Sequence, residues 1–258
     1  MSLGTTPSQD DATTARTIAR QAATRLLEIR TANAGIDSRE LKSLGDAGAQ
    51  ELIASLLSEL APGDAVLSEE AADSDVRLGA ERVWIIDPLD GTREYSEGRD
   101  DWAVHVALVE NGDLTLGAVA LGGPDEVLVS DSVAAAPVAG EGPLRIAVSR
   151  TRPPALVAHV AETLGAELVP MGSAGVKISS VVNGTADVYV HGGGQYEWDS
   201  AAPIAVARAA GLYTSRLDGS ELVYNQPNPY LPDLVVCRPE LKDRVMDAVA
   251  AALAAQPE

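Results

Sequence analysis

The sequence is poor in several residue types, and each shortage excludes a class of protein. It has no phenylalanine, and all aromatic residues together make up 3% of the chain. Its one cysteine, Cys237, can form no internal disulfide, and its apolar neighbours predict a buried strand position rather than a nucleophile. No apolar run approaches the roughly 20 residues that span a bilayer, and the first 30 residues contain no signal-peptide core. We therefore expect a cytoplasmic protein with no membrane partner.

Positive charge is also scarce. Lys and Arg number 19 against 38 Asp and Glu, so the formal net charge is −19. A nucleic-acid polymer needs a basic surface that neutralises its phosphate backbone, and this composition excludes such a partner. A small phosphate ester that is held through a metal ion remains compatible with the acidic charge.

The most informative stretch begins with the apolar residues 83–86, which predict a short buried strand. This strand runs directly into Asp87, Asp90, Gly91 and Thr92. Two carboxylates, a glycine and a hydroxyl at a strand end put oxygen ligands and free backbone N–H groups around one small volume, which suits a hard cation and a phosphate. The same residue types also form ordinary turns, so this stretch alone leaves both interpretations open.

Three further carboxylates stand at comparable places. Glu69 follows the apolar run 65–68, and Asp199 begins an alanine-rich helical run. Asp46 precedes a helix expected over residues 47–60, where it is either the N-cap of that helix or a member of the site. Carboxylates that converge from separate strand and helix ends repel one another, so this pattern indicates a bound cation.

Segments 68–70, 84–92 and 198–202 resemble, in the same order, the motifs of the Mg²⁺-dependent, lithium-sensitive phosphatase superfamily that contains the inositol monophosphatases. The resemblance extends from Asp46 to about Pro239. It implies an α/β (α+β) chain folded as a layered αβαβα sandwich. We expect residues 1–142 to form a metal-binding half and residues 143–258 a substrate-binding half, packed as one compact unit.

The resemblance also implies which residues act in catalysis. Two or three Mg²⁺ ions would be held by oxygen ligands. These ligands are Glu69, Asp87, the carbonyl of Leu89, Asp90 and Asp199. Asp46, Thr92 and Glu69 would be catalytic, with Asp46 orienting the Thr92 hydroxyl toward the attacking water. The chain offers no His/Cys set that would favour zinc.

Within the superfamily, the glycine tract 192–194 favours one substrate class. Inositol monophosphatases typically have a glutamate there that contacts inositol hydroxyls, and this chain has none. The sequence is most similar to bacterial CysQ-type 3′-phosphoadenosine-5′-phosphate phosphatases, which implies a role in sulfur assimilation. We expect hydrolysis of the 3′-phosphate of this adenosine bisphosphate, and of its 5′-phosphosulfate. Inositol-1-phosphate and fructose-1,6-bisphosphate remain alternative substrates, and a catalytically silent Mg²⁺-binding regulatory protein is the alternative class.

Residues expected to contact the substrate come from both halves of the chain. They are Gly91, Thr92, Arg93, Ser149, Arg150, Gly172, Ser173, Lys177 and Tyr196. His105 lies in a hairpin expected over residues 103–121, and we assign it a structural role because the chemistry needs no imidazole base. Relatives often form dimers, so the resemblance is compatible with a homodimer.

Overall fold

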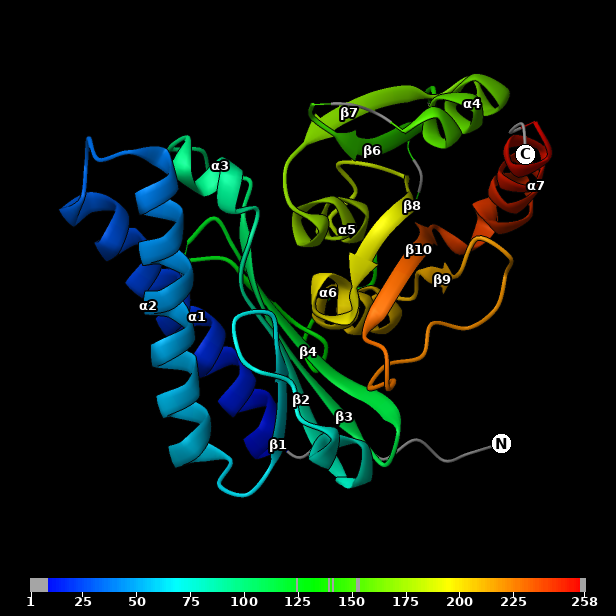
Figure 1. The fold of residues 1–258 in the computed structure, drawn as a ribbon. Coiled ribbons are helices and arrows are strands. Elements are labelled where there is room, and N and C mark those ends of the chain that lie inside the picture. Colours follow the sequence, from blue (N-terminus) through cyan, green and yellow to red (C-terminus); the bar gives the residue numbers. More distant parts are fainter. Residues whose placement is uncertain (1–8, 124, 139, 141, 152–153, 256–258) are drawn as a thin grey trace.

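The computed structural model describes residues 9–123, 125–138, 140, 142–151 and 154–255. Helices and sheets alternate in five layers, with two mixed sheets and helices outside and between them (Figure 1). This is the αβαβα sandwich expected from the sequence. None of the helices in the described residues is both long and apolar enough to cross a membrane.

The first sheet carries the long helices α1 (Gln9–Ala32) and α2 (Ser38–Leu60) on one face. Its strands follow chain order: β1 (Ala65–Ser68), β2 (Arg82–Asp90), β3 (Ala103–Glu110), β4 (Asp113–Leu121) and β5 (Val127–Val129). Successive residues of a strand point to opposite faces. Trp84 and Ile86 accordingly pack against α1 and α2, while Val83 and Ile85 face the middle layer.

The middle layer consists of α5 (Ala174–Val182) and α6 (Glu197–Ala209). The second sheet has the order β7-β6-β8-β10-β9. Its strands are β6 (Arg145–Ser149), β7 (Glu167–Met171), β8 (Val188–Tyr196), β9 (Tyr213–Ser215) and β10 (Tyr230–Cys237). The outer helices α4 (Ala155–Leu164) and α7 (Lys242–Ala254) cover its far face.

Helix α6 lies unusually close to the first sheet. A Cβ atom on Gly117 of β4 would stand 2.2 Å from the carbonyl oxygen of Ala202, so only glycine permits this approach. The N-terminal end of α6 is thereby held beside the ends of β2 and β3. Three short helices, η1 (Asp75–Gly79), α3 (Thr92–Ser96) and η2 (Pro239–Leu241), complete the elements of the described residues.

The start of α2 differs from the expectation. The helix begins at Ser38, not near residue 47, and Asp37 is its N-cap, with a carboxylate that accepts a hydrogen bond from the Arg39 amide at 2.8 Å. Asp46 therefore lies inside the helix, and its interpretation as an N-cap is wrong. Gly45 lies within the helix and serves packing, because a Cβ there would lie 2.9 Å from the Tyr95 ring.

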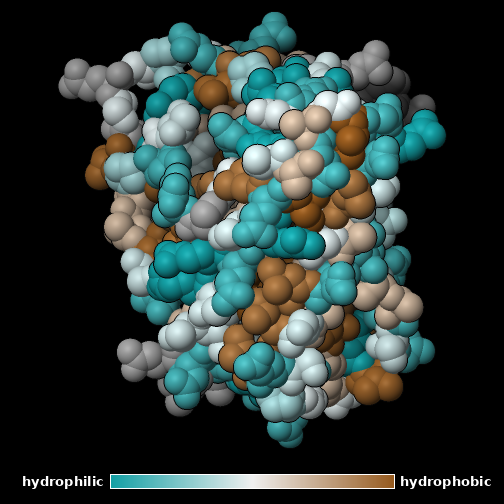
Figure 2. Space-filling model, turned by 90° about the vertical axis from the view of Figure 1, so that its left-hand side faces the viewer, coloured by the Kyte–Doolittle hydropathy of each residue, from teal (hydrophilic) through white to brown (hydrophobic). Residues whose placement is uncertain are grey.

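An apolar pocket of about 430 Å³ lies between α2 and β1. Its wall includes Ile53, Leu57, Val66 and Trp84. On the side of the molecule where α1 and α2 lie, Figure 2 shows apolar residues gathered in the lower half of the face, among hydrophilic ones. Trp84 points to the face of the first sheet that α1 and α2 cover, whereas Val83 and Ile85 point to the middle layer. This pocket and the middle layer therefore lie on opposite sides of the sheet.

Candidate metal centre

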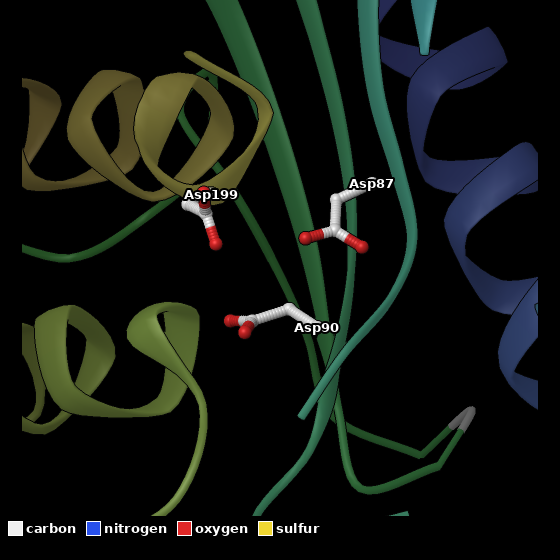
Figure 3. Close-up of side chains that lie close together, drawn as sticks. All are labelled: Asp87, Asp90 and Asp199. Atoms are coloured by element: carbon white, nitrogen blue, oxygen red, sulfur yellow. The ribbon is translucent and has the colours of Figure 1, made fainter. Parts of the chain in front are cut away.

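Three carboxylates from two elements converge between the first sheet and the middle layer. Asp87 and Asp90 come from the end of β2, and Asp199 from the first turn of α6. Each offers an oxygen, and these three oxygens lie within 4.8 Å of one another. Figure 3 shows the side chains of the triad turned toward a common space. The structure thus brings together three of the five ligands expected from the sequence.

An irregularity in β2 allows Asp87 and Asp90 to face the same way. Residues three apart on a regular strand point to opposite faces. The pairing with β3 shifts between them, so that Asp87 lies opposite His105 and Asp90 lies opposite Ala103, two residues away. A bulge of this kind re-aims side chains. Leu89, within the bulge, turns into the core under the helices and donates its amide to Asp87 Oδ1 at 3.0 Å.

Asp90 is anchored by the start of α5. Its Oδ2 accepts a hydrogen bond from the Ser173 hydroxyl at 2.5 Å and another from the Gly175 amide at 2.7 Å. Ser173 is the N-cap of α5 and has a left-handed φ of 50°. Asp199 is fixed similarly, because its Oδ2 accepts the Tyr196 amide at 2.7 Å. Both carboxylates are therefore oriented before any cation binds.

The triad carries more negative charge than its surroundings compensate. Burial raises the pKa of Asp87 well above its usual range, and the charges of Asp90, Glu69 and Asp199 raise it further. Burial and the charge of Asp90 raise the pKa of Asp199 to about 7. An all-oxygen set of buried, mutually repelling carboxylates fits a hard divalent cation.

His105 is the imidazole nearest to the triad, and its hydrogen bond fixes the orientation of its ring. Its ring is fully buried, with Nδ1 3.0 Å from the carbonyl oxygen of Trp198 and Nε2 3.4 Å from Asp90 Oδ2. Since a carbonyl only accepts, Nδ1 must carry the proton of that bond. The ring thereby connects β3 to the start of α6, which agrees with the structural role expected for it.

Glu69 and Asp46 lie at the rim of the cluster. Burial of the Glu69 carboxyl raises its pKa to about 7; a hydrogen bond with Asp87 counteracts this, and the neighbouring charges of Glu70, Asp90 and Asp46 add to it. Burial and Glu70 raise the pKa of Asp46 to about 7, against a smaller effect of Lys42. Helix α2 packs against α3, which begins with Thr92. The hydrogen bonds of the described residues include none between Asp46 and Thr92, so their pairing stays a prediction.

Arg93 and Arg150, which the sequence analysis expects to contact the substrate, form ion pairs with acidic residues. Arg93 pairs with Glu97 at 2.9 Å, and Arg150 reaches Glu97 at 2.6 Å and Glu94 at 3.1 Å. Their charges are thus largely neutralised by α3 and the residue that ends it. Gly172 donates its amide to Asp101 at 2.7 Å. A role of these residues in substrate binding stays a prediction.

Lys177 of α5 is the one cation near the triad that has no acidic partner among the described residues. Its side chain is buried, and its Nζ lies 5.5 Å from the centre of the Tyr189 ring. Burial lowers the pKa of Lys177, while the charges of Asp90, Glu94, Asp199 and others oppose that change. A buried ammonium without an ion pair is costly. A role of Lys177 in substrate binding stays a prediction.

Three polar residues of β8 that no sequence motif pointed to, Tyr189, His191 and Gln195, lie beside this lysine or beside one another. His191 Nε2 and Gln195 Oε1 are buried without a hydrogen-bond partner, and Tyr189 Oη lies 3.4 Å from His191 Nδ1 and from Gln195 Nε2. Buried polar atoms without partners are rare in proteins and often mark a ligand site. Residues 189 and 191 are two apart and share one face of the strand, which the sequence could have shown, whereas Gln195 follows an irregularity in the pairing of β8 with β10 that has no simple spacing.

The raised pKa values predict how the metal-free protein responds to pH. Asp46, Glu69 and Asp199 hold a proton more tightly in the folded chain than their usual pKa values of 3.8 and 4.5 allow in the unfolded chain. The stability that this proton contributes is therefore lost as the pH rises through about 7. We expect the thermal midpoint in chelator to fall from about pH 5 to 7.5, where these carboxyls are ionised in the unfolded chain and lose their protons in the folded one, and added divalent cation to reverse the fall, because ligands bind metal deprotonated. A midpoint that rises over this range would contradict the electrostatic description.

Comparison with known proteins agrees with this architecture. The model of the inositol monophosphatase family matches residues 8–254. A 3′-phosphoadenosine 5′-phosphate phosphatase of Mycobacterium leprae is 53% identical over 247 residues, which cover 90% of each chain. The protein of the same name from Mycobacterium tuberculosis is 52% identical over 235 residues, 87% of this chain and 88% of that protein. The crystal structure of CysQ from Bacteroides thetaiotaomicron superposes with a TM-score of 0.76 at 26% identity, covering 89% of this chain and 97% of that one.

Proposed function

The chain belongs to the inositol monophosphatase family, and from this premise we propose that it is a phosphoric monoester hydrolase that removes the 3′-phosphate of 3′-phosphoadenosine 5′-phosphate. One observation carries the proposal: the uncompensated acids Asp87, Asp90 and Asp199 lie near Lys177, a buried cation with no described acidic partner. The first group suits a metal-bound phosphate and the second suits another anion. A substrate with two phosphates satisfies both.

We propose Mg²⁺ as the ion, in two or three copies. Its ligands would be Glu69, Asp87, the Leu89 carbonyl, Asp90 and Asp199. When bound, it supplies Lewis-acid activation of a water molecule and neutralises charge on the phosphoryl group. Ser173 and the Gly175 amide hold Asp90 in place through hydrogen bonds at 2.5 and 2.7 Å, so its carboxylate needs little rearrangement.

The chain's own hydroxyl and carboxylates would manage the proton of the attacking water. Thr92 opens α3 directly after the triad strand, next to Gly91, whose φ of 88° directs the turn. Without a cation, burial and neighbouring acids raise the pKa of Asp46 and of Glu69 to about 7, and a bound cation would lower both, so that the two carboxylates would be ionised in the loaded site. We assign Thr92, oriented by Asp46, and Glu69 to this step.

Lys177 would meet the second phosphate of the substrate. Its ammonium interacts electrostatically with Asp90 and Asp199, so an anion bound there stays within reach of the triad. The unpartnered His191 Nε2 and Gln195 Oε1 offer further hydrogen bonds on the same face of β8. A 5′-phosphosulfate carries an anionic group at the same end of the molecule, so the proposal includes it as a substrate.

A substrate panel tests the proposal. We expect kcat/KM for 3′-phosphoadenosine 5′-phosphate to exceed that for inositol-1-phosphate and for fructose-1,6-bisphosphate by at least about 10²-fold, because sites built from hydrogen bonds discriminate on this scale or above it. The measurement is steady-state phosphate release at saturating Mg²⁺, with Li⁺ expected to inhibit every active substrate. Equal or reversed efficiencies would remove the nucleotide assignment, and metal-independent turnover would remove the triad from the mechanism.

A further inference from the structure

A buried arginine outside the metal centre ties two distant loops together. Arg77, in η1, is 2% exposed and forms two bonds with Asp73, from Nε at 2.7 Å and from Nη2 at 2.9 Å. Its Nη1 donates to Asn225 Oδ1 at 2.7 Å, and its Nη2 donates to the Gln226 carbonyl at 3.0 Å. Asn225 returns a bond from Nδ2 to the Arg77 carbonyl at 3.2 Å. A fork of this kind fixes both partners in orientation as well as in distance.

The same loop is bound on its other side by Glu197. This carboxylate is 1% exposed and accepts the amides of Asn225 at 2.5 Å and Gln226 at 2.7 Å. Asn225 has a left-handed φ of 59°, which presents its amide and its side chain to different partners. We call Arg77, Asn225, Gln226 and Glu197 the Arg77 clamp. It connects the chain segment 69–81 between β1 and β2, called the excursion below, to the first turn of α6.

Each end of the clamp is attached to a segment that carries a candidate ligand. Glu197 stands two residues before Asp199 in the first turn of α6. The excursion that Arg77 holds begins at Glu69, whose amide donates to the Ile86 carbonyl at 3.3 Å. The Glu69 residue as a whole is exposed, although its carboxyl is partly desolvated beside the acids of the site, so packing around its side chain does little to fix it. The distance between Glu69 and Asp199 is therefore set by the chain on either side of them.

We propose that the Arg77 clamp is a positioning device of the metal centre, which holds Glu69, at the end of β1, in place relative to Asp199 in the first turn of α6. The proposal rests on the proposed function only in taking the acid cluster as a cation site. Freeing the excursion would let its residues regain conformational entropy, which binding of a cation would then have to offset. Partners that hydrogen-bond a metal ligand directly typically alter metal affinity by 10- to 100-fold, and a clamp that acts through the adjoining chain should reach the lower end of this range.

The variant Asn225→Gly tests the clamp most cleanly. Glycine adopts the left-handed backbone readily and keeps the backbone amide that donates a hydrogen bond to Glu197. It removes both hydrogen bonds between the Asn225 side chain and Arg77. We expect it to weaken binding of Mn²⁺, which takes hard oxygen ligands like Mg²⁺, by about 10-fold or more. The measurement is the signal of free Mn²⁺ in electron paramagnetic resonance, with no substrate present. The Mg²⁺ concentration for half-maximal activity should rise in parallel, while kcat at saturating Mg²⁺ stays within about threefold of the wild type.

Arg77→Gln should show the same loss of affinity, with little further loss in the double variant, because both changes break one connection. Arg216→Gln is the matched control: it removes a two-bond pair with Asp233, at 2.8 and 2.7 Å, that lies outside the clamp. It should lower the thermal midpoint and leave Mn²⁺ affinity unchanged.

Unchanged Mn²⁺ affinity in Asn225→Gly, with a lowered midpoint alone, would mean a purely structural clamp and would overturn the proposal. So would a wild-type protein that binds no Mn²⁺. If the wild type binds Mn²⁺ but leaves the adenosine bisphosphate intact, the substrate assignment fails and the binding data still decide on the clamp.

Discussion

Asp87→Asn is expected to lower kcat by at least about 10³-fold while leaving the metal-free protein at least as stable as the wild type. Several kcal/mol of transition-state stabilisation depend on a bound cation in enzymes of this kind, and each 1.36 kcal/mol corresponds to a factor of about ten. Asp87 is 1% exposed and stands between Asp90, Asp199 and Glu69, so removing its charge weakens the cation site from the centre.

The expected gain in stability follows from the sign of the pKa change. Burial and three neighbouring acids raise the pKa of Asp87, which means that its ionised form destabilises the folded chain without a cation. Asparagine has nearly the same shape, carries no charge and keeps an oxygen for the Leu89 amide. The measurements are kcat at saturating Mg²⁺ and the thermal midpoint in chelator.

Asp187→Asn is the matched control, because Asp187 is equally buried but paired. Burial alone would raise the pKa of Asp187, but its bonds with Arg145 and Arg238 outweigh burial and lower it. Its replacement should reduce stability and leave the metal dependence of turnover unchanged. Near-normal activity in Asp87→Asn, or a loss of stability as large as that of Asp187→Asn, would contradict the assignment of Asp87 to the cation site.

Short-range sequence patterns predicted single strands and helices, whereas the layered fold and the convergence of Asp199 with Asp87 and Asp90 came from the resemblance to a known family. The apolar run 83–86 identifies a strand, and the acids after it identify its functional end. The five layers follow from amphipathic helices and strands together with the family resemblance. The bulge that turns Asp90 to the side of Asp87 has no comparable signature, since Pro88 is equally typical of a simple strand end.

The supporting contacts were beyond prediction because they join positions far apart in sequence. Ser173 holds Asp90 across 83 residues, and Arg77 binds Asn225 across 148 residues. No periodicity connects such pairs. The glycine within α2 has a long-range cause as well, because only the packing of Tyr95 against Gly45 explains why a glycine stands inside the helix.

Replacing Lys177 by methionine is expected to lower kcat/KM for 3′-phosphoadenosine 5′-phosphate by about 10²- to 10³-fold. Loss of one partner of a buried charged hydrogen bond costs about 2–5 kcal/mol, or about 30- to 5,000-fold, and the expected loss lies in the middle of this range. Adenosine 3′-phosphate lacks the second phosphate, so its much lower efficiency should hardly change. The thermal midpoint should not fall, because burial already disfavours the charged ammonium and lowers its pKa.

The comparison of the two nucleotides separates a phosphate ligand from a general contributor to the site. Lys242→Met is the matched control, since Lys242 also lies over a tyrosine ring, 4.9 Å from that of Tyr213, but belongs to the outer helix α7. It should leave both efficiencies unchanged. An equal loss for both nucleotides in Lys177→Met would mean that the ammonium supports the triad rather than the second phosphate, because a contact to an absent group cannot affect turnover of adenosine 3′-phosphate. Selective loss for the bisphosphate would place its second phosphate beside α5, where Lys177 is the cation without an acidic partner among the described residues.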